Sequence, residues 1–433
     1  MASQRVITAI DIGTDKCATL ISTVDDNGQL QVVGVSVVPS KGMRRSQIID
    51  LEKVLETITE SLDGAERMAG FEIQSAYVSV AGTHITSRNS KGVVAVASPN
   101  QEITRSDVTR VTDAARALSL PSDRQIIHVI PNAYKVDSQD GIKDPVGMTG
   151  VRLESEAHII TGLSTTLVNI EKCLQDLGLA VDGFVFAGLA SSLVTLSETE
   201  KELGVAVVDI GAGSTSICVY QEGSLIFSAS VPIGARHITQ DIALGCRVSL
   251  ETAEKIKLSL SKEEQQLSRP HAGESKEDFI ARKKKADQLK LSDFGVDDGE
   301  SLSRKTVIDG IMVPRIQEIF SLISDQLEDA NIISEIPAGI VVTGGGADTV
   351  RMVEVGKQEL KLSVRVGQPE ELKGLTSDIH KPSFATSIGL LVYGKAHGGG
   401  TAKRSFSLNF LGSRPSFSSI TNWFKKVITS VLP

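Results

Sequence analysis

Two segments of the chain share one pattern of apolar and polar positions. One reads VITAIDIGTDKCATLIS from Val6, and the other reads VAVVDIGAGSTSICVY from Val205. In each, an apolar run ends in Asp-Ile-Gly and a second run, rich in β-branched residues, follows. This pattern is typical of two strands joined by a tight, glycine-containing turn. Because the pattern occurs twice, the sequence predicts two related domains.

Around each hairpin the chain alternates between strand and helix periods. In the first half, the strand-like QLQVVGVSVV precedes a helical period over residues 51–68, and SAYVSVAG follows. In the second half, helices are expected over residues 250–260 and 306–330, before the strand AGIVVT at 338–343. Alternation of this kind predicts an α/β architecture in both halves.

Three segments interrupt or follow this plan. Residues 85–155 contain two strand-like runs around a helical period at 105–118, which predicts a small α+β module inserted into the first domain. Residues 261–300 are highly charged, and we interpret them as a helical subdomain with a solvated face. Residues 394–418 are rich in Gly, Ser and Arg and lack periodicity, as is typical of a flexible linker.

The last residues, 419–433, have the pattern of an amphipathic helix. An apolar stripe at helical spacing is formed by Ile420, Trp423, Phe424, Val427, Ile428, Val431 and Leu432, with Lys425 and Lys426 beside it. Such a helix is about 20 Å long at ~1.5 Å per residue, too short to cross a bilayer but suited to lie in its interface. The alternative is a helix that docks on the protein's own core or on a partner.

Composition narrows the class of protein. The chain has 433 residues, of which 41% are hydrophobic and 23% charged, enough for two or more domains with their own cores. Its four cysteines are far apart and form no CxxC pair, which indicates a reducing compartment rather than a zinc site or a disulfide framework. We find no signal peptide, and no apolar run approaches the ~20 residues of a membrane span.

Charge is unevenly distributed along the chain. The net charge of −8 argues against a nucleic-acid-binding protein. No acidic residue follows Asp378, however, so the C-terminal end is basic. A basic end suits an anionic membrane surface.

The two Asp-Ile-Gly turns are candidates for phosphate binding, because glycine lets backbone N–H groups approach phosphate oxygens. Thr14 and Ser214 add hydroxyls, and Lys16 is placed to meet a β-phosphate. Asp11 and Asp209 are expected to face each other across a cleft and to hold Mg²⁺ through water, because Mg²⁺ sheds its hydration reluctantly. Either hairpin alone is more simply an ordinary turn.

A third glycine-rich element follows the strand at 338–343. Three glycines precede a helix expected over residues 350–360, an arrangement that lets backbone approach a nucleoside or a phosphate. Alone, this element is equally well a plain turn. The candidate nucleotide-binding residues of the three elements are Asp11, Gly13, Thr14, Asp15, Lys16, Asp209, Gly211, Ala212, Gly213, Ser214, Thr215, Gly344, Gly345 and Gly346.

The order of two phosphate hairpins, TGGGA and a closing small-residue helix at 384–393 resembles the actin, sugar-kinase and heat-shock-chaperone superfamily. The resemblance implies an actin-like two-domain ATPase fold that binds ATP and Mg²⁺, with Glu254 and Lys257 reaching ribose and adenine. The position of the module, the segment EAHIITG and the run AGIVVTGGGAD followed by FATSIGLLVYGK resemble the FtsA family of bacterial cell-division proteins.

The resemblance also implies a division of the chain. The first domain comprises residues 1–84, completed by 156–190 and 375–394, with the module at 85–155. The second domain comprises residues 191–245 and 306–374, with an outer part at 246–305. A linker at 395–418 and a membrane-targeting helix at 419–433 complete the chain.

Membership of that family implies partners. The protein would assemble into filaments and anchor the FtsZ ring to the cytoplasmic face of the membrane at the division site. It would also meet later membrane proteins of the division machinery. Arg304 and Lys305 match a family segment that contacts the FtsZ C-terminal tail, although a solvated helix-capping pair is nearly as good an interpretation.

Hydrolysis in the superfamily needs a Gln, Glu or Asp that orients water toward the γ-phosphate. Residues 186–192 offer none, and Ala212 stands where actin has a second aspartate. We therefore expect slow or absent hydrolysis, with nucleotide acting as a conformational ligand. The alternatives are an actin-like adaptor of pilus assembly, which lacks the terminal helix, and a small-molecule kinase or phosphatase, which needs a catalytic Asp in the cleft.

Overall fold

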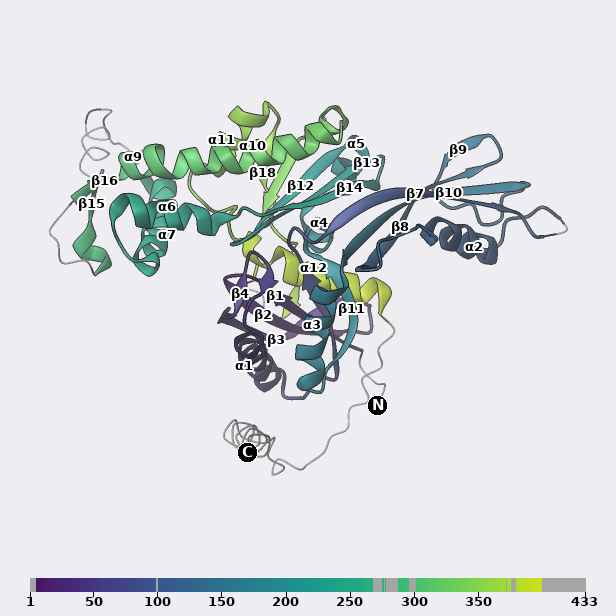
Figure 1. Ribbon diagram of the computed structural model, residues 1–433, viewed down its shortest axis with the longest axis horizontal. Coiled ribbons are helices and arrows are strands. Elements are labelled where there is room, and N and C mark those ends of the chain that lie inside the picture. The colour runs from purple at the N-terminus through teal and green to yellow at the C-terminus, as the bar shows by residue number, and fades with distance from the viewer. Residues whose placement is uncertain are drawn as a thin grey trace, which may run out of the picture.

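The computed structural model describes residues 5–98, 100–267, 275, 277, 287–295, 301–370, 372–374 and 379–398. Two α/β domains meet along one edge, and an elongated module and a helical outer part extend from them in opposite directions (Figure 1). The predicted membrane helix at 419–433, most of the linker at 395–418 and much of the charged segment at 261–300 lie outside the described residues.

Each domain is built on one sheet, and five strands of the first sheet have the same order as the five strands of the second. The sheet of domain I is β11 (Ala180–Phe186), β6 (Ser75–Val80), β1 (Val6–Ile12), β2 (Lys16–Val24), β3 (Leu30–Pro39) and β19 (Lys373–Gly374). The sheet of domain II is β18 (Val364–Val366), β17 (Ile340–Thr343), β12 (Val205–Ile210), β13 (Thr215–Gln221) and β14 (Ser224–Val231). In both, the first strand of the hairpin is antiparallel to its hairpin partner and parallel to the strand on its other side. The two predicted hairpins and the internal repeat are therefore present.

Helices cover these sheets, and their ends follow from capping residues. In domain I, α1 (Leu51–Ala69) begins after Asp50, whose side chain accepts from the backbone N–H of Lys53. It ends at Gly70, which adopts a left-handed φ of 80°. The other helices of this domain are α3 (Ser164–Asp176), α4 (Ala187–Thr195) and α12 (Ala385–His397), while domain II contains α5 (Glu198–Leu203), α6 (Ala235–Cys246), α7 (Leu250–Leu267) and α11 (Met352–Leu360).

The long helix predicted at 306–330 has a widened turn inside it. The structure has α9 (Arg304–Val307), a π-helical turn at Ile308–Met312 and α10 (Val313–Asp329), without a break between them. Val307, Ile308 and Met312 are all buried in the core of domain II, so the widened turn keeps one apolar face continuous. A short ladder of β15 (Gln288–Lys290) and β16 (Ser301–Ser303) lies at the start of α9.

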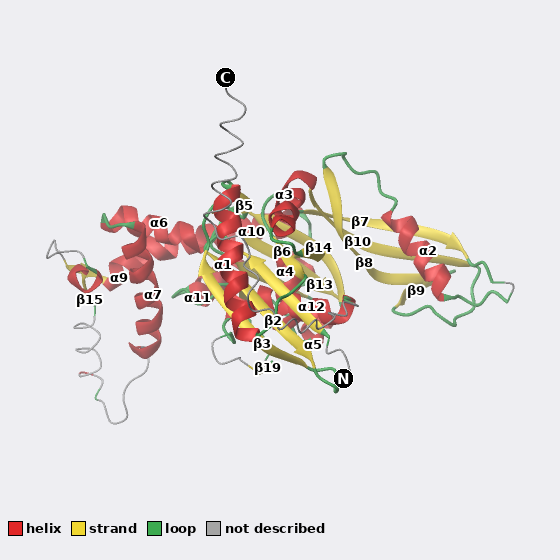
Figure 2. Cartoon of the chain, turned by 90° about the horizontal axis from the view of Figure 1, so that it is seen from below, coloured by secondary structure: helices red, strands yellow, loops and turns green. Residues whose placement is uncertain are grey.

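The inserted module is one four-stranded sheet covered by one helix. Its strands are β7 (Thr86–Ala95), β10 (Arg152–Leu163), β8 (Arg124–Val136) and β9 (Gln139–Ile142), in that order, and α2 (Arg105–Arg116) runs along one face (Figure 2). A small separate core includes Ile103, Val111 and Leu153. The prediction ended the module at residue 155, but β10 continues to Leu163, because Thr161 still pairs with Thr86.

The module also contacts domain II along β14. The Ser87 hydroxyl donates to the Ser228 carbonyl over 2.7 Å, and the Asn89 side chain donates to the Ile226 carbonyl over 3.2 Å. The His158 ring lies between Asn89 and Ser228, at 2.6 and 3.0 Å. We call this set of contacts the β14 seam.

The C-terminal helix of domain I is longer than predicted. The linker was expected from residue 395, but α12 continues to His397 because Arg5 contacts its last turn. The Arg5 guanidinium donates to the carbonyls of Gly394 and Lys395, over 2.8 and 3.1 Å. Among the described residues, no helix is long and apolar enough to cross a bilayer.

Candidate functional site

A cavity of about 330 Å³ lies where the two domains meet, and three glycine-rich turns open into it. Most of the predicted residues lie in its wall, from both domains. These are Asp11, Gly13, Thr14, Asp15, Lys16, Asp209, Gly211, Ala212, Gly213, Ser214, Glu254, Lys257, Gly344 and Gly345. Residues from distant parts of the chain therefore share one site.

The two aspartates lie at the ends of corresponding strands, β1 and β12. Asp11 accepts from the hydroxyls of Ser79 (2.7 Å) and Ser387 (3.2 Å), and Asp209 accepts from Thr386 (2.7 Å). Burial, opposed by the hydrogen bond from Thr386 and assisted by the nearby Asp11 charge, raises the pKa of the Asp209 carboxyl to about 6. A cation beside the two carboxylates would favour the ionised form of the buried Asp209.

Lys16 is held in the wall of the cavity by the segment before α12. Its ammonium donates to the Ser383 carbonyl over 2.6 Å and lies 3.8 Å from the centroid of the Phe384 ring. Burial lowers the pKa of Lys16, while the charges of Asp11 and Asp209 oppose that shift. A phosphate beside this ammonium would offset the cost of its burial.

The two Asp-Ile-Gly turns close in the same way and touch each other. The backbone N–H of Gly13 donates to the Lys16 carbonyl (2.9 Å), and that of Gly211 donates to the Ser214 carbonyl (3.0 Å). A Cβ atom at Gly213 would lie only 2.6 Å from the Thr14 hydroxyl. The close approach of the two turns therefore requires glycine at this position.

Two predicted residues face away from the cavity. Thr215 is buried, and its hydroxyl donates to the Ile233 carbonyl over 2.8 Å. Gly346 uses its N–H to bond the Ile210 carbonyl over 2.8 Å, and the Ile210 side chain leaves no room for a Cβ there. Both positions shape the turns, and a contact of either with nucleotide remains a prediction.

Glu254 and Lys257 lie one helical turn apart on α7. The Lys257 ammonium contacts the Glu254 carboxylate at 2.8 Å and the Thr239 hydroxyl at 3.0 Å. Thr239 belongs to α6, so this pair also joins the two helices. A carboxylate and an ammonium fixed in a cavity wall can offer both an acceptor and a donor to a nucleoside.

Several residues of the wall were missed from the sequence. Ser46 lies in the turn between β4 (Met43–Arg44) and β5 (Gln47–Ile48), and Arg236 lies in the first turn of α6. Ser79 and Thr386 supply the hydroxyls that bond the two aspartates. Of these residues, only Thr386 lies in a segment that the sequence had singled out for its resemblance to the superfamily, the small-residue run FATS at the start of the closing helix.

The segment expected to carry a hydrolytic residue forms the end of β11 and the start of α4. Within it, Ala187 lines the cavity, and Ser191 and Ser192 are fully buried. The segment thus brings no carboxylate or amide side chain to the site. Slow or absent hydrolysis remains a prediction.

Arg304 and Lys305 lie away from the cavity, at the start of α9. Their backbone N–H groups donate to Asp287, to its carbonyl at 2.7 Å and to its carboxylate at 2.9 Å. The helix cap is Ser303, whose hydroxyl accepts from the N–H of Thr306. A contact of Arg304 and Lys305 with a partner remains a prediction.

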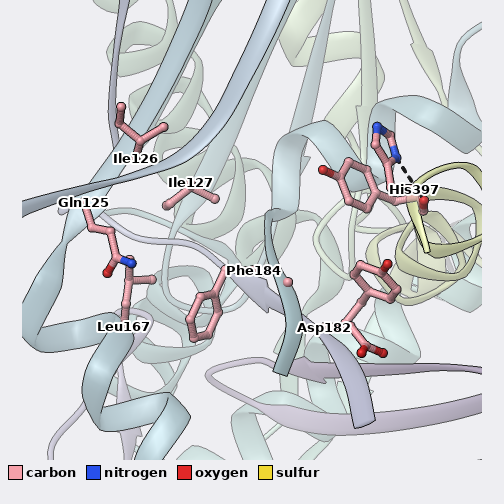
Figure 3. A pocket seen from close by; sticks show the side chains of 10 residues that line it. Gln125, Ile126, Ile127, Leu167, Asp182, Phe184 and His397 are labelled. Carbon is pink, nitrogen blue, oxygen red and sulfur yellow. Dashed lines mark hydrogen bonds between the residues drawn. The ribbon is translucent and has the colours of Figure 1, made fainter. Parts of the chain in front are cut away.

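A second hollow of about 210 Å³ lies at the base of the module, and Figure 3 shows its walls. Gln125, Ile126 and Ile127 of β8 line one side, and Asp182 and Phe184 of β11 line another. The His397 ring stacks on Tyr393, with centroids 4.0 Å apart, and its Nδ1 donates to the Tyr393 carbonyl. The residues that line this hollow include none of the predicted site residues.

Two family models match two separate parts of the chain. A family model described as "SHS2 domain inserted in FTSA" matches residues 82–161. A second, described as "Cell division protein FtsA", matches residues 206–389. The first match covers the module, and the second covers most of domain II.

Relatives match over nearly the whole chain. A protein named cell division protein FtsA from Pseudomonas aeruginosa is 36% identical, over 96% of this chain and 94% of its own length. The proteins of that name from Bacillus subtilis and Escherichia coli K12 are 34% and 32% identical, over 91% and 98% of this chain and 84% and 97% of their own lengths.

Solved structures show the fold. The structure described as the PilM-PilN type IV pilus biogenesis complex aligns with a TM-score of 0.61 at 14% identity, over 90% of this chain and 98% of that one. The ethanolamine utilization protein EutJ from Carboxydothermus hydrogenoformans aligns with a TM-score of 0.50 at 15% identity, over 90% of each chain. These likenesses concern the fold alone.

Proposed function

We propose that this chain is a nucleotide-dependent anchor of the division ring. The chain belongs to the FtsA family of cell-division proteins and has an actin-like fold with an inserted module, and the proposal follows from that membership. In this proposal the protein binds ATP with Mg²⁺, assembles into filaments and ties FtsZ polymers to the cytoplasmic face of the membrane.

One observation carries the nucleotide part of this proposal: Asp11 and Asp209, from separate domains, line one cavity with Lys16 and two glycine turns. The turns offer backbone N–H groups to phosphates, and Lys16 offers a positive charge. Asp11 and Asp209 would hold Mg²⁺ through its water shell, which neutralises their mutual repulsion. Glu254, Lys257, Gly344 and Gly345 would hold the nucleoside.

Binding in this cavity would act mainly on conformation. The site lies between two domains, so a ligand that contacts both favours the arrangement in which both contacts are made. No carboxylate from residues 186–192 reaches the cavity, which supports slow hydrolysis. Nucleotide would then control assembly rather than serve as a substrate that is rapidly turned over.

The partner assignments follow from family membership and from the sequence. Residues 419–433 would bind an anionic membrane surface as a peripheral anchor, and Arg304 and Lys305 would contact the FtsZ C-terminal tail. Copies of the chain and later membrane proteins of the division machinery complete the set of partners. An adaptor of pilus assembly is less well supported, since the likeness to the PilM-PilN structure is limited to the fold.

Nucleotide binding by the full chain tests the first part. We expect Lys16→Ala to weaken Mg-ATP binding about tenfold or more, because a charge-assisted contact to phosphate is lost. Isothermal titration calorimetry gives the affinity, and Lys305→Ala serves as a matched lysine control that should bind as the wild type does. Equal affinities of wild type and Lys16→Ala would place the phosphates elsewhere.

Cosedimentation with anionic vesicles tests the anchor. We expect the full chain, with Mg-ATP, to pellet with vesicles and to bring an FtsZ tail peptide with it. A chain truncated after Gly398 should remain in the supernatant while still binding nucleotide. If both proteins pellet equally, the membrane contact does not lie in residues 419–433.

A further inference from the structure

The turn between β4 and β5 has an unusual backbone. Met43 pairs with Ile48 and Arg44 with Gln47, so only Arg45 and Ser46 form the turn. Both have positive φ, 48° and 60°, where Asn and Gly are preferred and other side chains are strained. Strain of this kind, beside a functional site, calls for a reason why the side chain is kept.

The contacts of Ser46 supply that reason. Its backbone N–H donates to the Thr14 hydroxyl over 2.9 Å, and its own hydroxyl lies 2.7 Å from the Ser214 hydroxyl. Thr14 belongs to the first phosphate hairpin and Ser214 to the second. Ser46 is therefore a direct bridge between the two domains at the cavity.

The turn also fits between two glycines. A Cβ atom at Gly213 would lie 2.9 Å from the Arg45 Cα, and one at Gly82 would lie 3.3 Å from the Ser46 Cβ. Gly82 follows β6 of domain I, and Gly213 lies in the hairpin of domain II. Any side chain at Gly213 would push the turn, and the Ser46 hydroxyl with it, out of place.

We infer that Ser46 is a ligand of the terminal phosphate of a bound nucleoside triphosphate, and that its contacts couple the presence of this phosphate to both domains. The inference rests on the proposed nucleotide function. We place the inner phosphates at the glycine turns and Lys16, and the terminal phosphate where the hydroxyls of Thr14, Ser46 and Ser214 meet, at the contact of the two hairpins. A phosphate oxygen there accepts a stronger, charge-assisted bond than the neutral one between Ser46 and Ser214.

The chemistry assigns a donor role to the Ser46 hydroxyl. The backbone N–H of Ser46 already donates to the Thr14 hydroxyl, so the turn stays in place while the Ser46 hydroxyl rotates from Ser214 to the phosphate. Ser214 can donate to the same phosphate, so the two domains are then joined through the ligand rather than directly. Diphosphate would leave the direct Ser46–Ser214 contact intact.

Two variants separate the hydroxyl from the strained backbone. Ser46→Ala removes the hydroxyl, and Ser46→Gly removes it while relieving the strain at positive φ. Arg45→Gly is the matched control, because it relieves strain at the neighbouring position and leaves every atom of Ser46 in place. The affinities of the full chain for Mg-ADP and for a non-hydrolysable Mg-ATP analogue are measured by calorimetry.

We expect both Ser46 variants to lose about tenfold in affinity for the triphosphate and less than about twofold for the diphosphate. Arg45→Gly should keep the wild-type ratio of the two affinities. An unchanged ratio in Ser46→Gly, or no preference of the wild type for triphosphate, overturns the inference while leaving nucleotide binding intact. Failure of the wild type to bind either ligand overturns the proposed function itself.

Discussion

At the scale of single residues, His128 is a buried histidine held in one tautomer. Its Nε2 accepts from the backbone N–H of Phe186 over 3.0 Å, so the proton is on Nδ1, which faces the Tyr393 hydroxyl at 3.4 Å. Burial, with smaller contributions from the neighbouring His397 and His158, lowers the pKa of His128 to about 3. Protonation of Nε2 would place its N–H against the backbone N–H of Phe186, so that two donors would face each other.

This arrangement gives a defined dependence of stability on pH. Since the pKa of His128 is lower in the folded chain than in the unfolded one, the unfolded state binds more protons and stability falls as pH decreases below about 6.5. We expect His128→Gln, which keeps an acceptor for Phe186, to lessen the loss of stability between pH 7 and pH 5 by about 2 kcal/mol. Urea unfolding at several pH values measures it.

The control for this experiment is His380→Gln, a partly exposed histidine remote in sequence. The same measurements on this variant show how much of the change follows from the loss of any one histidine. If His128→Gln keeps the full acid sensitivity, His128 is already protonated in the folded chain.

Site residues that belong to a local sequence motif were predicted, whereas those that only the fold brings to the site were missed. Asp11, Lys16 and Asp209 were predicted because each belongs to a local motif of strand, turn and glycine. Ser46 and Ser79 were missed, because a serine has no distinctive pattern and only the fold brings it to the site. Thr215 was predicted as a nucleotide-binding residue from its place in the second turn, and strand alternation directs its side chain to Ile233.

At the scale of elements, α4 and α12 approach each other unusually closely. A Cβ atom at Gly389 of α12 would overlap the carbonyl oxygen of Ala190 in α4. The first turn of α12 carries Thr386 and Ser387, which bond the two aspartates. The position of α12 against α4 therefore sets the position of these hydroxyls.

We expect Gly389→Ala to destabilise the protein by about 2 kcal/mol or more, because the added methyl group overpacks a backbone contact. Gly310→Ala is the matched control: its Cβ would meet only a methyl group of Thr306, at 4.0 Å, so we expect a change within about 1 kcal/mol. Thermal unfolding compares the two. Equal stability of both variants would show that α12 moves away from α4 at little cost.

Elements with a clear period were predicted and lie close to the predicted positions. The helix at 51–68 is α1, and the strand at 338–343 contains β17. The two-residue strands β4 and β5 and the π-helical turn at Ile308–Met312 were not predicted. Short strands have no period, and a π turn adds one residue to a helix without changing which face is apolar.

At the scale of the whole molecule, the inserted module is bound to both domains. Its strand β8 contacts domain I, where His128 accepts from the backbone N–H of Phe186, while the β14 seam attaches the module to domain II. The sequence predicted the module and its class from the interruption of the α/β pattern. It did not indicate the β14 seam, since hydrogen bonds from Ser87 and Asn89 depend on the placement of two sheets.

We expect the double variant Ser87→Ala and Asn89→Ala to raise hydrogen exchange in β7 and β14 about tenfold or more, because the bonds of Ser87 with Ser228 and of Asn89 with Ile226 and His158 are lost. Thr109→Ala is the control, since that hydroxyl bonds only within α2, to the Arg105 carbonyl. Exchange monitored by mass spectrometry would contradict the expectation if both variants behaved alike.

The helix α12 also makes a mechanical connection. Its 13 residues span about 20 Å, with Thr386 and Ser387 on the two aspartates at one end and Arg5 on its last carbonyls at the other. Tension applied beyond His397 would be borne by this rod and delivered to the paired carboxylates and to β1, which starts beside Arg5 and ends at the first of them. A pull from that end would reach the cavity through Thr386 and Ser387, and it would reach β8 of the module through the contact of Tyr393 with His128.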